Sequence, residues 1–117
     1  MNGLHLTADL QGCSSAGLLG DADALRRLAL ASVQEAGLTP VGELFHRFGA
    51  GGGVTGVVLL AESHLALHTW PEIAAVTLDV YVCSYTSDNS AKAERLFDAL
   101  MQAFQPADPH LHRVVRA

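Results

Sequence analysis

Apolar and polar residues alternate over residues 4–10 and again over residues 75–83. This period of two is typical of strands that bury one face. Residues 54–61 are almost wholly apolar and rich in β-branched side chains, which predicts a more deeply buried strand. The pattern predicts three further strands, over residues 41–48, 64–70 and 110–116.

Two other stretches carry apolar residues at the spacing of an amphipathic helix. Asp21 or Asp23 can cap the first helix, which runs to about Ala36 before a glycine. Residues 87–90 offer caps for the second, which ends at Pro106. The two apolar faces consist of Leu25, Leu28, Ala29, Val33 and Ala36 in the first helix and of Leu96, Phe97, Leu100, Met101 and Phe104 in the second.

The order of these elements predicts the α+β class. We expect one domain over residues 1–117, a two-layer sandwich of one mainly antiparallel sheet with two helices on one face. The other face of the sheet then needs a cover or carries the function. Residues 13–17 are expected to form a loop. Residues 49–53, four glycines and an alanine, lie between strands, so we expect a hairpin-like loop inside the domain. This loop either is a flexible linker or lets backbone approach a ligand closely.

Composition excludes several classes of protein. The formal net charge is −5 and Lys92 is the only lysine, so we expect no nucleic-acid partner and no pyridoxal phosphate site. The longest apolar run, residues 57–61, is too short for a membrane span. With two cysteines and no evident signal peptide, the expected location is the cytoplasm.

The densest chemistry lies in residues 62–72, with Cys83 one strand further on. Each of these side chains alone fits an ordinary polar strand edge. A metal site would use His64 and His68 with Glu62 or Glu72 and Cys83, but the two imidazoles lie further apart on a strand than on a helix, so we expect no metal. A serine hydrolase is also conceivable, but Ser63 lacks the glycine pattern of a nucleophile elbow.

The Glu-Ser-His of residues 62–64 and the His-Thr-Trp-Pro-Glu of residues 68–72 resemble the self-cleavage region of prokaryotic S-adenosylmethionine decarboxylase proenzymes. Residues 45–48, 53–58 and 79–83 are also similar to that family. The resemblance is strong from Phe45 to Cys83 and weak at both ends of the chain.

This resemblance implies self-cleavage between Glu62 and Ser63, into a β chain of residues 1–62 and an α chain of residues 63–117. Ser63 attacks the carbonyl of Glu62 and becomes a pyruvoyl group, which forms a Schiff base with the substrate without pyridoxal phosphate or metal. His68 is implied as the processing base. Thr55 stands where the family usually has a serine that assists processing.

The same resemblance assigns the substrate contacts. Cys83 matches the acid that returns a proton to the substrate carbon, Glu72 matches the residue that holds the ribose hydroxyls, and Phe48 is the candidate that stacks on adenine. The product would supply the aminopropyl group for spermidine synthesis. The family also implies a homodimer of cleaved protomers whose active sites draw on both subunits.

Three departures from the family pattern leave the substrate open. The loop after Phe48 is glycine-rich, Ser84 stands where a glycine is frequent, and no aromatic residue precedes Phe45 to supply a second wall for a purine. The alternatives are ornithine or arginine, whose side-chain cation Asp9 or Glu72 would pair. A homologue that is never cut and only binds a partner is a third interpretation.

Overall fold

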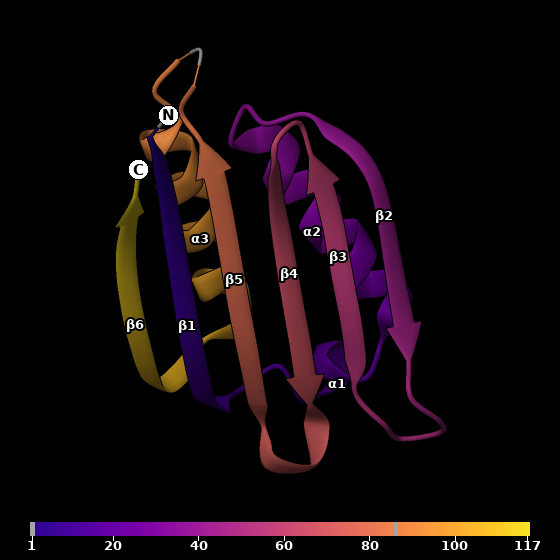
Figure 1. The fold of residues 1–117 in the computed structure, drawn as a ribbon. Helices are drawn as coiled ribbons and strands as arrows, with labels where there is room; N and C mark the ends of the chain where they lie inside the picture. The colour runs from indigo at the N-terminus through magenta and orange to yellow at the C-terminus, as the bar shows by residue number, and fades with distance from the viewer. Residues whose placement is uncertain (1, 86) are drawn as a thin grey trace.

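One six-stranded sheet and two long helices make up the molecule in a computed structural model, which describes residues 2–85 and 87–117 (Figure 1). Every neighbouring strand pair is antiparallel. The predicted α+β class is confirmed. The strands are β1 (Gly3–Cys13), β2 (Pro40–Arg47), β3 (Val54–Leu60), β4 (Ser63–Trp70), β5 (Ala75–Cys83) and β6 (Pro106–Arg116), and the helices are α1 (Ala16–Leu19), α2 (Ala22–Glu35), α3 (Ser90–Phe104) and the 3₁₀ turn η1 (Pro71–Ile73).

The core lies between the sheet and the helices α2 and α3, which pack side by side on one face (Figure 1). The strands run in the order β2-β3-β4-β5-β1-β6. Asp21 caps α2 as predicted, since its carboxylate accepts a hydrogen bond from the Ala24 amide at 3.0 Å. Within the described residues, no helix is both long and apolar enough to cross a bilayer. The fully buried side chains include Leu25, Ala29 and Val33 of α2 and Leu96, Leu100 and Phe104 of α3.

Two elements differ from the sequence-based expectation. The predicted loop over residues 13–17 runs instead into α1, whose four residues are too few to show a periodic pattern, although Leu19 is fully buried. Strand β6 begins at Pro106 and not at residue 110. It is an edge strand and Pro106 is its first residue, and these are positions in a sheet where proline is tolerated.

The glycine-rich segment forms the predicted hairpin loop between β2 and β3. The Phe48 amide closes the loop by donating to the Gly53 carbonyl at 2.9 Å. Gly51 has a φ of +73°, which L side chains rarely adopt. Gly53 lies so close to the Thr69 carbonyl that a Cβ atom would overlap it. The loop is therefore a tight turn packed against the end of β4.

The face of the sheet opposite the helices is left uncovered by the described residues (Figure 1). The strand registers place all six histidines of the sequence on this open face. Apolar side chains are exposed there as well, among them Leu44 and Leu59. The open face carries His5 on β1, His46 on β2, His64 and His68 on β4, and His110 and His112 on β6.

The Thr69 side chain links β4 to the start of β3 and to the end of α1 through hydrogen bonds. Its buried hydroxyl accepts from the Val54 amide at 2.9 Å and donates to the Leu19 carbonyl at 2.6 Å. We expect Thr69→Val to lower the free energy of unfolding by about 1–3 kcal/mol, because it leaves two buried backbone groups unpaired. Chemical denaturation measures this loss. Thr7→Val, on the open face, is the matched control, and an equal effect in both variants would contradict the role given to Thr69.

Candidate active site

Glu62, Ser63 and Cys83 meet where β4 begins and β5 ends. The Ser63 hydroxyl oxygen accepts a hydrogen bond from the Cys83 amide at 3.0 Å. The Cys83 thiol donates to the Glu62 carboxylate at 3.7 Å. The structure therefore gathers the predicted cleavage residues and the predicted proton donor at one end of the sheet.

The bond between Glu62 and Ser63 lies at the β3–β4 turn, which only Ala61 and Glu62 form. Glu62 is in the left-handed region, with a φ of +56°. For an L residue other than glycine this conformation costs about 1–2 kcal/mol. The backbone is thus strained immediately before the predicted cleavage point, and cutting there would release the strain.

The two cysteines occupy different surroundings. Cys13 belongs to the hydrophobic core, and its burial raises the pKa of its thiol. Cys83 is also buried, but it lies outside that core cluster and contacts Glu62. Cys83 is therefore the thiol that can serve the site, and Cys13 is a packing residue.

A second group of predicted residues lies at the other end of the sheet. Thr55 and His68 face each other across β3 and β4, and the Thr55 hydroxyl is 2.9 Å from Nδ1 of His68. Both line a pocket of about 370 Å³ together with Phe48, Trp70 and Glu72. The predicted processing residues and substrate contacts therefore share one cavity.

Trp70 also lines this pocket, although no role was predicted for it from the sequence. It lines the cavity with Phe48, and 40 % of Trp70 and 58 % of Phe48 are exposed. The sequence offered one signal for it, its place between His68 and Glu72. The pocket thus has two aromatic side chains although the first strand supplies none.

These two groups do not meet within one chain. Ser63 and His68 lie at opposite ends of β4, five residues apart, which corresponds to roughly 16 Å along a strand (Figure 1). The alternation of side chains along the strand also sends them to opposite faces. Each group is therefore an incomplete site: the first has the nucleophile and the thiol, and the second has the imidazole and the pocket.

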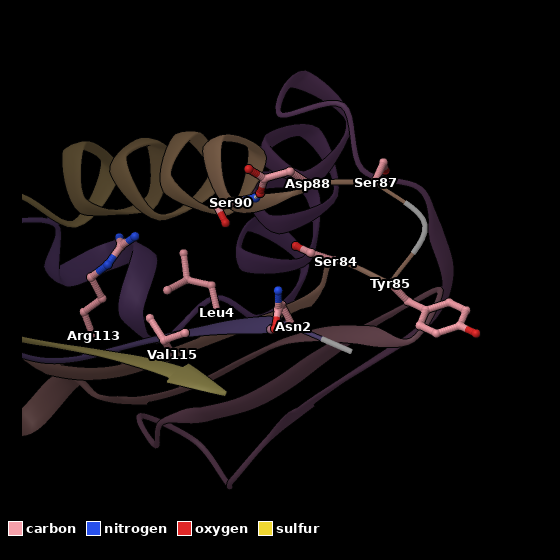
Figure 2. Close-up of a pocket in the computed structure, with 10 residues that line it drawn as sticks. Asn2, Leu4, Ser84, Tyr85, Ser87, Asp88, Ser90, Arg113 and Val115 are labelled. Carbon is pink, nitrogen blue, oxygen red and sulfur yellow. The ribbon is translucent and has the colours of Figure 1, made fainter. Parts of the chain in front are cut away.

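A separate pocket of about 480 Å³ lies beyond Cys83, between the start of β1 and the start of α3 (Figure 2). Figure 2 shows Tyr85 pointing away from the other lining residues. The Asp88 carboxylate accepts a hydrogen bond from the Ser90 amide at 2.9 Å, which lowers the pKa of Asp88. The Asp88 carboxylate is therefore the negatively charged group at the start of α3. No predicted site residue lines this pocket.

The model of the S-adenosylmethionine decarboxylase family matches residues 4–117. The chain belongs to this family. It is 36% identical over 114 residues to the S-adenosylmethionine decarboxylase proenzyme of Picrophilus torridus, covering 97% of this chain and 83% of that one. It is 38% identical to the proenzyme of Archaeoglobus fulgidus, covering 89% and 88%. The crystal structure of the adenosylmethionine decarboxylase from Aquifex aeolicus superposes with a TM-score of 0.82 at 36% identity, covering 97% and 88%.

Membership of the S-adenosylmethionine decarboxylase family confirms the resemblance seen in the sequence. These relatives carry the name of the main predicted activity, and none of the three is named an ornithine or arginine decarboxylase. The roles of the individual site residues stay predictions. These residues are Ser63, His68, Cys83, Thr55 and the residues of the pocket.

Proposed function

We propose that this chain is a self-processing S-adenosylmethionine decarboxylase that works as a homodimer with a pyruvoyl group made from Ser63. The observation that carries the proposal is the division of the site into two incomplete groups at the two ends of β4. Ser63 and Cys83 fit a pyruvoyl centre, because the hydroxyl and the thiol lie at the same strand end. When present, the pyruvoyl group would supply the electron sink for loss of the substrate carboxylate.

The processing step uses side chains of this sequence and water, without an external cofactor. The Ser63 hydroxyl oxygen attacks the Glu62 carbonyl carbon, and the amide bond is replaced by an ester. A base then takes the α-proton of Ser63, and elimination releases the carboxylate of Glu62 and leaves dehydroalanine at residue 63. This residue tautomerises to an imine, and one water hydrolyses the imine to the pyruvoyl group with release of ammonia. His68 suits this task when its Nδ1–H donates to the Thr55 hydroxyl oxygen 2.9 Å away, because this fixes the ring and leaves Nε2 to accept the proton.

A two-fold dimer would bring the two groups together. Suppose that two copies pack through their open faces about a two-fold axis that lies between the two sheets, perpendicular to the strands. Each strand then lies opposite the same strand of the other copy and runs in the reverse direction. The Ser63 end of β4 then lies opposite the His68 end of β4 in the partner. The Ser63 side chain points toward the helices, so the imidazole of the second copy approaches the backbone side of Ser63, where the α-proton lies. The exposed apolar side chains on the open face, such as Leu44 and Val114, support this packing, since two sheet faces can bury such groups against each other.

The pocket beside His68 suits a nucleoside with a positive charge. Phe48 and Trp70 offer two aromatic faces for a purine and for a sulfonium cation. The Glu72 carboxylate can accept hydrogen bonds from two ribose hydroxyls. Ornithine and arginine have neither a ring nor a ribose, so this set of side chains favours S-adenosylmethionine.

The substrate is tested by offering carboxyl-labelled S-adenosylmethionine, ornithine and arginine to the processed enzyme and measuring released carbon dioxide. We expect S-adenosylmethionine to be turned over fastest. Phe48→Ala and Trp70→Ala should each raise its KM roughly threefold to thirtyfold, and Glu72→Gln roughly tenfold or more. Tyr85→Ala, an exposed aromatic residue outside this pocket, should leave KM unchanged. Faster turnover of ornithine or arginine would refute the substrate and leave the self-processing intact.

Cys83 is expected to return the proton to the substrate carbon. In the cut Cys83→Ala enzyme we therefore expect decarboxylation to fall about a hundredfold or more, the range that general acids supply. Steady-state kcat on protein shown by mass to be fully cut measures this loss. Cys13→Ala is the control, because the Cys13 thiol lies in the core and should affect stability alone. Turnover near that of the parent in cut Cys83→Ala would exclude the role.

A further inference from the structure

The open face holds a cluster of side chains that the proposed reaction does not use. His5, His64 and Asp79 each offer one ligand atom, and these three atoms lie within 4.8 Å of one another. A ring nitrogen of His5, Nε2, is hydrogen-bonded to the Asp79 carboxylate. The sequence-based expectation of no metal considered His64 together with His68, whereas the sheet brings His64 close to His5, 59 positions earlier in the chain and two strands away.

Three adjacent strands hold this cluster. Tyr81 of β5 lies opposite His64 on one side and opposite His5 on the other. The two imidazoles therefore flank β5, and Asp79, two residues before Tyr81, points to the same face. The ring centroids of His5 and His64 are 6.2 Å apart at an interplanar angle of 82°. The ligands thus sit on paired strands, which hold them more rigidly than loops would.

Two imidazole nitrogens and one carboxylate oxygen form a ligand set that suits Zn²⁺ and similar first-row ions, whereas Mg²⁺ and Ca²⁺ prefer oxygen ligands. We propose that His5, His64 and Asp79 bind one zinc-class divalent cation. The ion takes the place of the proton between His5 and Asp79, and that proton passes to solvent. All three side chains are only partly buried within one chain, so a water molecule enclosed between the two open faces of the proposed dimer can fill a fourth position.

The charges around the cluster also bear on the proposal. One carboxylate faces the ion in a chain whose formal net charge is −5, which favours a cation. Arg116 brings a positive charge to the same face, with its guanidinium over the Tyr81 ring at 5.2 Å from its centroid. Tyr81 lies opposite both imidazoles on the neighbouring strands, so the Arg116 charge is close to the cluster. Removing that charge with Arg116→Gln should therefore strengthen cation binding modestly.

The test uses the full-length, untagged Ser63→Ala chain, so that changes beside the cleavage point cannot act through processing. We expect Co²⁺ to bind at one ion per chain with the visible absorption of a tetrahedral site, and Zn²⁺ to displace it. His5→Ala and Asp79→Asn should each weaken binding roughly tenfold or more. His110→Ala and His112→Ala, histidines of the same face outside the cluster, are the matched controls and should bind as the parent does.

Thermal unfolding provides a second measurement that does not depend on colour. Zn²⁺ should raise the Tm of the parent, because an ion that binds only the folded chain stabilises it. The nearly isosteric Asp79→Asn should show no such rise, even if His5→Ala fails to fold. Lack of stoichiometric Co²⁺ absorption in the parent would overturn the proposal. So would binding that survives Asp79→Asn or that disappears in His110→Ala or His112→Ala.

Discussion

Freshly purified protein should consist of two chains, residues 1–62 and residues 63–117, and Ser63→Ala should remain a single chain. The expected effect is all or none, because alanine lacks the oxygen that attacks the Glu62 carbonyl. Intact mass spectrometry measures both products and shows whether the second chain carries a pyruvoyl cap in place of an amine. The strained φ of Glu62 and the Ser63 hydroxyl beside Cys83 are the structural grounds for this result.

Ser87→Ala is the matched control for the cleavage experiment, because Ser87 is an exposed serine at the same end of the sheet. This variant should be cut like the parent. A parent chain that stays whole after long incubation at neutral pH would contradict self-processing. It would support instead the third interpretation, a homologue that binds a partner without being cut.

Two uncut variants should restore cleavage when they are expressed together. Ser63→Ala and His68→Ala are each expected to stay whole alone. In a mixed two-fold dimer, Ser63 of the His68→Ala chain meets the intact imidazole of the Ser63→Ala chain, which completes one site. With random pairing, about half of the His68→Ala chains lie in mixed dimers and can be cut. Differently tagged chains on a denaturing gel show which of the two is cleaved.

The control for this mixture is a chain that carries both changes, Ser63→Ala and His68→Ala, paired with the His68→Ala chain. It supplies the same dimer without the imidazole, so no cleavage is expected. Absence of cutting in the first mixture, while mixed dimers are demonstrably present, would show that His68 does not act across the interface. The experiment therefore separates a shared site from a site within one chain.

Most of the fold could be predicted from the sequence because most strands and helices have apolar residues at a regular spacing. The alternation over residues 4–10 and 75–83 gave β1 and β5, and Asp21 gave the start of α2. The missed helix α1 spans four residues, about one turn, which is too short for periodicity to reveal. The early start of β6 escaped prediction because proline usually ends a strand, and its tolerance here depends on the edge position.

The candidate site was predictable only where its residues lie in one motif. The block from Glu62 to Glu72 gave the cleavage point and most of the pocket, with Trp70 named but given no role. Contacts between distant segments left no sequence signal. The hydrogen bond between His5 and Asp79 joins residues 74 positions apart, and it depends on the strand order, which places β1 beside β5.

The strand order gives cleavage a consequence for how the molecule is held together. A cut after Glu62 leaves β1, β2 and β3 in one chain and β4, β5 and β6 in the other. In the sheet these strands interleave, since β3 pairs with β4 and β1 lies between β5 and β6. Three hydrogen-bonded strand pairs, β3–β4, β5–β1 and β1–β6, each join a strand of one chain to a strand of the other. The two chains therefore cannot separate without unfolding. Refolding of the cut enzyme is a bimolecular reaction, whereas the precursor folds as a single chain. The fold of the mature enzyme is therefore reached before the cut is made.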